Sequence, residues 1–135
     1  METTRNFTVT ESMIDLFNHM NYKRYIDIFE EERANWFNAI GLPFKEMRNQ
    51  GFAVVILKID FEYKKEARLG EHLKAISRPG KMGNKSFTLE QTIYNAEEEA
   101  ITTSVCTFVM FNMETRTSMP VVEEIKAYFT VTSKA

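Results

Sequence analysis

Hydrophobic and polar residues alternate along five segments of the chain, and a period of two is typical of a β-strand with one buried face. In chain order these segments are residues 6–10, 55–63, 72–78, 85–94 and 101–113. Breaker residues gather in residues 79–84, which predicts a turn, and the polar residues 95–99 predict a hairpin connection. The last four segments are therefore expected to be strands joined by short turns.

Residues 21–40 have a different pattern, because their apolar positions recur at helical spacing along one face. These positions are Tyr22, Tyr25, Ile26, Phe29, Trp36, Phe37 and Ile40. Asn18 and Asn21 are both good N-cap residues, and Gly41 followed by Pro43 ends the pattern. The sequence thus predicts one long helix with a marked start and a marked stop.

The other segments are less regular. Residues 42–51 are expected to form a loop, and Pro120 is expected to open a short amphipathic helix over residues 121–129. The order is strand, long helix and then four strands, with no internal repeat or linker. This order predicts an α+β fold in which an antiparallel sheet packs on one helix, as a single domain over residues 1–135.

Composition narrows the classes of function. With 135 residues, of which 44% are hydrophobic, the chain can build one core. Its net charge is −2 with scattered basic residues, so we expect no nucleic-acid partner. The longest apolar run, residues 52–57, falls far short of the roughly 20 residues of a membrane span, and the polar N-terminus does not resemble an export signal. A single cysteine, Cys106, fits a buried strand thiol in a reducing, cytoplasmic setting.

The candidate chemistry lies in residues 15–22, between the first strand and the helix. Asp15 is a carboxylate just before a helix N-terminus, whose free N–H groups and positive dipole end can hold a developing oxyanion. A base and an oxyanion hole would then lie side by side. The alternative is purely structural: Asp15 and Asn18 cap the helix, and His19 bonds to the backbone. Spacing alone leaves both interpretations open.

The same residues carry a resemblance to a known family. The pattern consists of Asp15, His19, Met20, Asn21 and Tyr25, followed on the helix by Phe29, Glu30 and Arg33. It is similar to the signature of the 4-hydroxybenzoyl-CoA thioesterase-like family of hotdog proteins. Residues 67–71 and 85–87 resemble later landmarks of the family, so the likeness covers nearly the whole chain. Two positions depart from it, with Asn18 where glycine is usual and Tyr22 where a second asparagine is common.

The resemblance implies a hotdog fold, in which a curved antiparallel sheet wraps around one long central helix, and an acyl-CoA thioesterase that forms homodimers or homotetramers. Asp15 matches the catalytic carboxylate, and His19 matches the position whose backbone N–H binds the thioester carbonyl. Asn21, Tyr25 and Glu30 match substrate-binding positions, with Glu30 expected to reach the site from the partner subunit. Whether Asp15 attacks directly or activates water stays open, as does the identity of the acyl group: fatty, aromatic or betaine-like.

Lys85 lies beside a glycine-rich turn, where a charged hairpin tip would be the ordinary explanation. It precedes Ser86 and Phe87 as the family's phosphate-contacting lysine does, so we expect it to bind the CoA phosphates. We predict no metal, because two distant histidines and one cysteine do not make a ligand cluster. No cofactor is expected either, since coenzyme A would be part of the substrate.

Two rival functions share the fold. A hydroxyacyl-thioester dehydratase would need a histidine that transfers protons, but its histidine-rich motif with downstream glycine and proline is absent from the sequence. A non-catalytic acyl-CoA-binding protein is the second rival. The presence of Asp15 and the absence of a preceding helix-turn-helix segment favour the enzyme, and a turnover assay separates the two.

Overall fold

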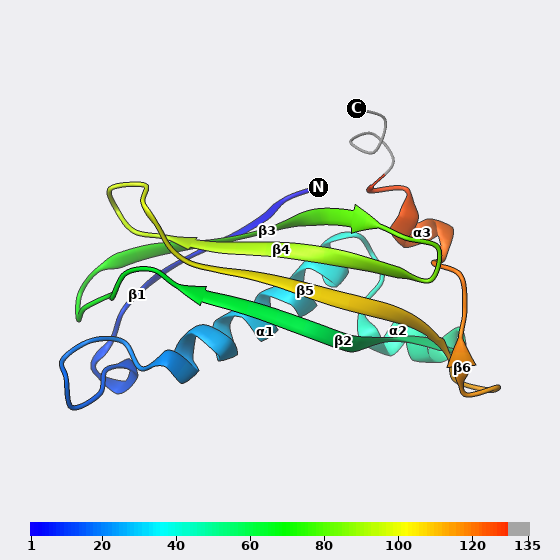
Figure 1. Cartoon of the computed structure of the whole chain (residues 1–135), viewed down its shortest axis with the longest axis horizontal. Helices are drawn as coiled ribbons and strands as arrows, with labels where there is room; N and C mark the ends of the chain where they lie inside the picture. Colours follow the sequence, from blue (N-terminus) through cyan, green and yellow to red (C-terminus); the bar gives the residue numbers. More distant parts are fainter. Residues whose placement is uncertain (130–135) are drawn as a thin grey trace.

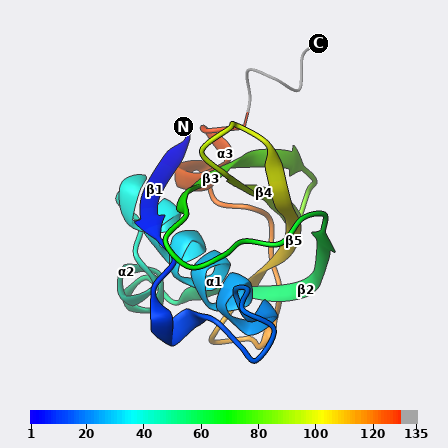
Figure 2. The ribbon, with the colours of Figure 1, turned by 90° about the vertical axis from the view of Figure 1, so that its left-hand side faces the viewer.

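The computed structural model describes residues 1–129, so residues 130–135 of the predicted single unit lie outside the described residues. A curved antiparallel sheet follows the order β1-β3-β4-β5-β2, with β6 paired to β5. Its strands are β1 (Thr3–Thr8), β2 (Phe52–Tyr63), β3 (His72–Met82), β4 (Ser86–Tyr94), β5 (Ala100–Asn112) and β6 (Thr117–Ser118). The sheet curls around the helix α1 (Tyr22–Ala39), as Figures 1 and 2 show from two directions. The predicted α+β arrangement is confirmed.

The helix α1 forms where the periodicity predicted it. Asn21 is its N-cap, with a side-chain oxygen that accepts a hydrogen bond from Lys23 N at 2.9 Å. Gly41 follows the last turn at φ +79°, a left-handed conformation that glycine adopts without strain. The face toward the sheet buries Tyr25, Ile28, Phe29, Glu32, Arg33, Trp36 and Phe37. Two of these buried residues are charged, which the hydrophobic pattern does not predict.

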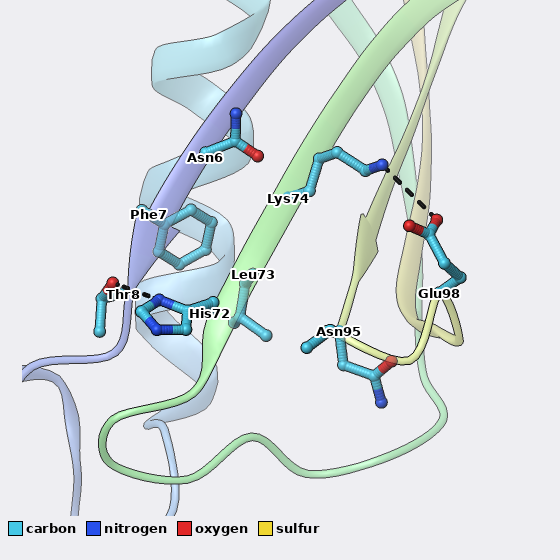
Figure 3. Close-up of a pocket in the computed structure, with 9 residues that line it drawn as sticks. Asn6, Phe7, Thr8, His72, Leu73, Lys74, Asn95 and Glu98 are labelled. Carbon is cyan, nitrogen blue, oxygen red and sulfur yellow. Dashed lines mark hydrogen bonds and ion pairs between the residues drawn. The ribbon is translucent and has the colours of Figure 1, made fainter.

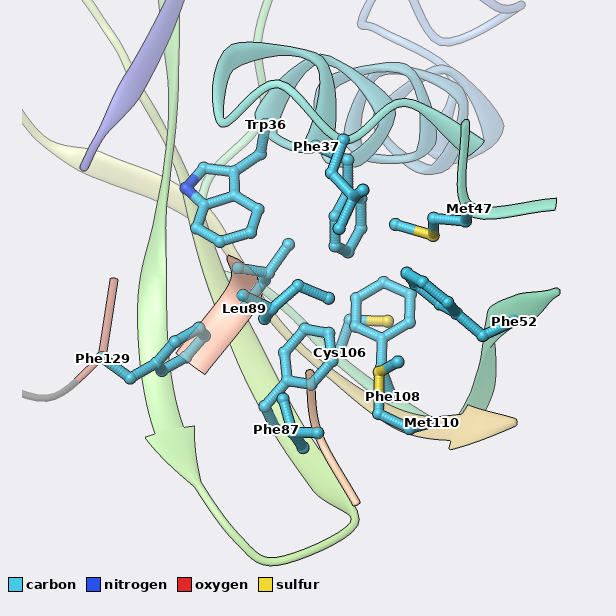
Figure 4. Close-up of a cluster of buried hydrophobic side chains, with 13 residues drawn as sticks. Trp36, Phe37, Met47, Phe52, Phe87, Leu89, Cys106, Phe108, Met110 and Phe129 are labelled. Atoms are coloured by element: carbon cyan, nitrogen blue, oxygen red, sulfur yellow. The ribbon is translucent and has the colours of Figure 1, made fainter. Parts of the chain in front are cut away.

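Two apolar clusters fill the space between α1 and the sheet. The larger surrounds Trp36 and Phe37 and includes Phe87 and Phe108, whose rings stack at 5.3 Å between centroids (Figure 4). The smaller lies nearer the start of the helix, around Tyr25 and Phe29. Cys106 belongs to the larger cluster and is fully buried in β5, so the predicted buried strand thiol is confirmed.

Strand β3 corrects the predicted turn over residues 79–84, because it continues to Met82 and the turn is shorter. The pairing of β1 with β3 ends at Ser77, so the proline at position 79 meets no strand on that side and needs no N–H for the ladder. Gly80 fits because an added Cβ would lie 2.2 Å from Thr88 Oγ1. The breakers therefore mark an irregularity in the pairing of β3 with β4, where the register shifts between Pro79 and Met82.

Other boundaries also differ from the predictions. The first strand is Thr3–Thr8, shifted toward the N-terminus by its pairing with β3. The expected loop contains the short helix α2 (Phe44–Asn49), whose single buried residue, Met47, gives no visible period. The C-terminal helix α3 (Glu123–Lys126) is shorter than predicted. Within residues 1–129, no helix combines the length and apolar character that spanning a membrane requires.

Candidate active site

Asp15 lies in a tight turn between the short 3-10 helix η1 (Glu11–Met13) and α1. Its N–H donates to His19 O at 3.0 Å, and its carboxylate Oδ1 accepts from Phe17 N at 2.8 Å. Asn18 takes the left-handed conformation, with φ +65°. Because glycine and asparagine are the residues that tolerate this conformation, the backbone explains how Asn18 can stand where the family usually has glycine.

The segment 64–71 holds this turn in place. Met20 N donates to Ala67 O at 2.7 Å, and His19 forms an isolated antiparallel bridge with Arg68. Asn21 N donates to Met13 O at 2.8 Å, which fixes the entry to the helix. The turn is therefore anchored by backbone bonds on both sides, and Asp15 is positioned by the fold.

Three titratable side chains meet at the turn. His19 Nδ1 lies 3.9 Å from Asp15 Oδ1, and His19 Nε2 lies 3.9 Å from Glu66 Oε1. Both separations exceed hydrogen-bond length, so no fixed proton path joins these groups. The Asp15 side chain keeps 26% of its surface exposed. One Asp15 carboxylate oxygen thus accepts a hydrogen bond from Phe17 N, and the exposed part of the carboxylate is accessible to water and to a substrate.

At the start of α1, the residue that caps the helix and the candidate catalytic residue are different residues. Asn21, not Asp15 or Asn18, caps the helix and takes up the N–H of Lys23. Tyr22 is the first helical residue, so its N–H has no acceptor within the helix. Among residues 1–129, neither the N–H of Tyr22 nor that of His19 donates a hydrogen bond to a described acceptor. These two donors are therefore unpaired within the described residues, and the sequence singled out only the one of His19.

A pocket of about 360 Å³ opens beside these groups. It is lined by Asp15, His19, Met20, Tyr22, Tyr25, Tyr63, Lys64, Lys65 and Glu66. Tyr25 and Tyr63 meet edge to face at 5.5 Å between ring centroids. Burial raises the pKa of the Tyr25 phenol to about 12, so this side chain stays protonated and serves as a wall or a hydrogen-bond donor. The part of the pocket lining formed by residues 63–66 was not predicted, because only long-range pairing brings these residues next to the Asp15 turn.

Two predicted site residues lie away from Asp15 within one chain. Glu30 is exposed further along α1, in a separate pocket with Arg33 and the start of β2. Lys85 is exposed in the turn between β3 and β4, at the opposite end of the sheet from the Asp15 turn (Figure 1). A single chain therefore brings Asp15, His19 and Tyr25 to one pocket, but not Glu30 or Lys85. Asn21 is a neighbour in the chain, but its side chain caps α1 and does not line the pocket.

A further hollow of about 310 Å³ lies between β1, β3 and the hairpin at residues 95–99 (Figure 3). Four of its polar side chains form two pairs, with His72 Nδ1 2.9 Å from Thr8 Oγ1 and Lys74 Nζ 3.5 Å from Glu98 Oε1. Among the described residues, no three acidic, histidine or cysteine side chains are grouped as metal ligands would be. The absence of a metal and of a cofactor stays a prediction.

Comparisons with known proteins agree with this geometry. The long-chain acyl-CoA thioesterase FadM of Escherichia coli (strain K12) is 25% identical over 114 residues, which cover 84% of this chain and 86% of FadM. The Staphylococcus aureus protein SAV2348, solved in complex with CoA, has a TM-score of 0.88 at 24% identity and covers 99% of this chain and 85% of its own. Slr0204, a 1,4-dihydroxy-2-naphthoyl-CoA thioesterase from Synechocystis, has a TM-score of 0.84 at 15% identity and covers 98% of both chains.

These structural likenesses confirm the predicted hotdog arrangement of sheet and helix. The family model described as the Thioesterase-like superfamily matches residues 9–129, a range that includes the Asp15 turn, α1 and the whole sheet after β1. The resemblance drawn from the Asp15, His19 and Asn21 pattern is confirmed, and the chain belongs to the thioesterase-like superfamily.

Proposed function

We propose that this protein hydrolyses an acyl-CoA thioester to the free acid and coenzyme A, with Asp15 as the catalytic carboxylate. The observation that carries the proposal is the Asp15 turn. Asp15, with its partly exposed carboxylate, lines a pocket of about 360 Å³ together with His19 and Tyr22, whose backbone N–H groups have no described acceptor. Membership of the thioesterase-like superfamily supports the reaction type.

The chemistry follows from these groups. The thioester carbonyl oxygen would accept hydrogen bonds from the N–H of Tyr22 or His19 at the start of α1, where the helix dipole favours developing negative charge. The free Asp15 oxygen then either removes a proton from an attacking water or adds to the carbonyl carbon itself. In both routes the C–S bond breaks and coenzyme A leaves as a thiolate that takes up a proton. Water attack gives the free acid directly, whereas attack by Asp15 gives a mixed anhydride that a water then hydrolyses to the free acid and the Asp15 carboxylate.

We also propose that the site is completed by a second copy of the chain. Strand β2 forms one edge of the sheet and pairs only with β5 among the described strands. Its side chains include Val55, Ile56 and Leu57, which are 41%, 50% and 69% exposed. An edge strand with exposed apolar side chains invites pairing with another strand. Antiparallel pairing of β2 with its own copy would cover both the edge and these side chains.

Such pairing would also bring the separated site residues together. In an antiparallel pair, the start of β2 in one chain lies beside the end of β2 in the other, where Tyr63 lines the Asp15 pocket. Glu30 shares a pocket with the start of β2, so it would approach the partner's Asp15 turn. The end of the sheet that carries Lys85 would turn toward the same side, which supports its proposed contact with the CoA phosphates.

The two rival functions are less well supported. A dehydratase would need His19 to carry a proton. Its ring nitrogens lie 3.9 Å from the carboxylates of Asp15 and Glu66, which exceeds hydrogen-bond length, and the Glu66 side chain is more exposed than the His19 ring. A protein that only binds acyl-CoA has no need for a carboxylate held at the start of a helix. The cytoplasmic location stays a prediction.

A hydrolysis screen tests the proposal. The purified protein would be incubated with acetyl-, octanoyl-, palmitoyl-, benzoyl- and betainyl-CoA, and the release of free thiol would be followed with a chromogenic disulfide. We expect turnover of at least one of these thioesters. Tight binding of acyl-CoA without any release of thiol would support the binding protein, and removal of water from a 3-hydroxyacyl-CoA would support the dehydratase.

A further inference from the structure

The Asp15 turn carries two large apolar side chains that its own chain leaves uncovered. Leu16 is 98% exposed and Phe17 is 78% exposed, which makes them the two most exposed large hydrophobic residues among residues 1–129. Backbone bonds from Asp15 N to His19 O and from Asn18 N to Asp15 O close the turn, so these two side chains project from it. Single exposed apolar residues are ordinary, whereas a pair that projects together favours a contact surface.

Phe17 is also bonded directly to the candidate catalytic residue. Its N–H donates to Asp15 Oδ1 at 2.8 Å, and among residues 1–129 no other group donates a hydrogen bond to that carboxylate. The Phe17 ring stacks on the His19 ring, with centroids 6.0 Å apart and planes inclined by 17°. A movement of Phe17 would therefore reorient Asp15, and whatever holds the Phe17 ring also holds the carboxylate.

An apolar hollow lies at the opposite end of the molecule, between α2 and the start of β2 (Figure 1). It has a volume of about 250 Å³ and is lined by Phe44, Met47, Arg48, Phe52, Ala53, Val54 and Met113. All of these residues except Arg48 are apolar, and Phe44 is 48% exposed. The volume is below the roughly 300–1,000 Å³ of pockets that bind small molecules, so it suits a side chain better. We call this hollow the α2 groove.

Antiparallel pairing of two β2 strands would bring the Asp15 turn of one chain to the α2 groove of the other. Strand β2 begins at Phe52, in the α2 groove, and ends at Tyr63, which lines the Asp15 pocket. Where two copies of this strand run antiparallel, the beginning of one lies beside the end of the other. In a two-fold dimer each contact occurs twice, so each chain would insert its own Phe17 and receive the partner's Phe17.

The charges around the turn favour a protein partner over a lipid surface. Segments that bind in a membrane interface are normally rich in lysine and arginine around their apolar side chains. The cations of segment 64–68 are instead each paired with a glutamate, in the pairs Lys64–Glu62, Lys65–Glu99 and Arg68–Glu66. Glu11 is exposed just before the turn. An anionic lipid surface would thus meet no free cluster of cations in this segment.

We propose that Phe17 is a positioning residue of the thioesterase and that its ring binds in the α2 groove of a second copy of the chain. The contact fixes the Phe17 N–H, and this N–H holds Asp15 Oδ1 in place for the reaction. Activity is thereby linked to pairing through one side chain, because a lone chain leaves both Phe17 and Asp15 without this support. The inference rests on the proposed function and on the proposed pairing along β2.

Single variants test the two sides of the contact. Phe17→Ala removes the ring but keeps the N–H, whereas Met113→Glu places a charge in the α2 groove and leaves the Asp15 turn untouched. At protein concentrations that keep each variant dimeric, we expect kcat to fall by about tenfold or more with KM nearly unchanged. The dimer Kd, measured by sedimentation, should rise by about tenfold or more, as for a central aromatic contact. Phe17→Leu should restore most of kcat, because it keeps an apolar side chain.

Leu69→Ala is the matched control. Leu69 is 52% exposed on the segment that holds the Asp15 turn, but it does not line the Asp15 pocket. Neither kcat nor the dimer Kd should change in this variant.

Mixing the two variants separates a contact between chains from an effect within one chain. A dimer of one Phe17→Ala chain and one Met113→Glu chain still contains one intact contact, because the second chain keeps Phe17 and the first keeps the α2 groove. Dimers of either variant alone contain none. After exchange of subunits in an equal mixture, activity should exceed the mean of the two variants by about twofold or more.

The failures of the two proposals are distinguishable. An active wild type whose Phe17→Ala variant keeps both kcat and dimer Kd would overturn the inference and leave the thioesterase in place. So would a mixture that gains no activity. The inference also fails if Phe17→Ala keeps its dimer Kd but abolishes binding of the wild type to phosphatidylglycerol vesicles, since the turn would then be a lipid contact. A wild type that hydrolyses no CoA thioester would overturn the proposed function and the positioning role with it, whereas the dimer Kd would still show whether Phe17 binds the second copy.

Discussion

Replacing Asp15 by Asn is the sharpest perturbation that the structure offers. Asparagine is nearly the same size, and its side-chain oxygen can still accept the hydrogen bond that Phe17 N donates to Asp15 Oδ1 at 2.8 Å. Asp15 does not cap α1, since Asn21 does, so the helix loses nothing. The exchange therefore removes the carboxylate charge and leaves the turn intact. The free energy of unfolding should change by less than about 1 kcal/mol.

The expected loss of activity is much larger than this change in stability. A positioned base or nucleophile contributes roughly 10²–10⁴ in rate. At about 1.4 kcal/mol for each factor of ten, this corresponds to about 3–6 kcal/mol of transition-state stabilisation. Because the carboxylate acts mainly in the transition state, kcat should fall by roughly this factor while the binding of substrate persists.

The assay is steady-state release of free CoA thiol from a thioester that the wild type hydrolyses, with thermal melts run in parallel. Asp27→Asn is a matched control: Asp27 lies on the exposed side of α1 in a pair with Arg24, where loss of the charge should cost at most about 1 kcal/mol of stability and no activity. A folded Asp15→Asn protein with the turnover of the wild type would refute the catalytic role and leave Asp15 as a residue that only shapes its turn.

Three further predictions follow from other parts of the molecule. Lys85→Ala should raise KM for CoA thioesters with kcat nearly unchanged, the result of losing binding shared by substrate and transition state; equal KM values would exclude the phosphate contact. Leu57→Lys places a charge on the exposed edge of β2 and should shift the protein toward a 15.8 kDa monomer in light scattering, with loss of activity; an active monomer would contradict the shared site. Gly80→Ala should lower the free energy of unfolding by about 1–3 kcal/mol in urea melts, since its Cβ would meet Thr88 Oγ1; an unchanged midpoint would show that Thr88 moves aside.

Local patterns predicted most of the fold. The period of α1 and its ends at Asn21 and Gly41 are set by residues close in sequence, so the helix was predicted almost to the residue. The predicted third strand ended at residue 78, earlier than β3 does, because Pro79 and Gly80 are breakers in most settings. Here the proline lies beyond the end of β1, and the glycine lies where a side chain would meet Thr88. Both reasons are tertiary and cannot be read from a local window.

Part of the candidate site could likewise be predicted from residues close in sequence, and part could not. Asp15, His19 and Asn21 lie within a span of seven residues, and this span predicted a polar turn before the helix. The catalytic role of Asp15 came from the family resemblance and stays a prediction. Glu66 reaches His19 only because the segment 64–71 pairs with the turn from the other side. The contact between Arg33 and Gln91 joins residues 58 positions apart. Groups brought together by such long-range pairing leave no periodic signal in the sequence.

The length of α1 supports the proposal that two chains complete each active site. Tyr22 borders the Asp15 pocket, and Arg33 lies 11 positions further along, which at 1.5 Å per residue is about 16 Å along the helix axis. The core around Tyr25 and Phe29 fills the space between the helix and the sheet over that distance, so an acyl group held at Asp15 cannot pass inside its own chain to Arg33. The pocket of Arg33 instead opens at the start of β2, the edge where a second copy would bring its own Asp15 turn. Pairing along β2 would therefore convert two half-sites in each chain into two complete sites in the dimer.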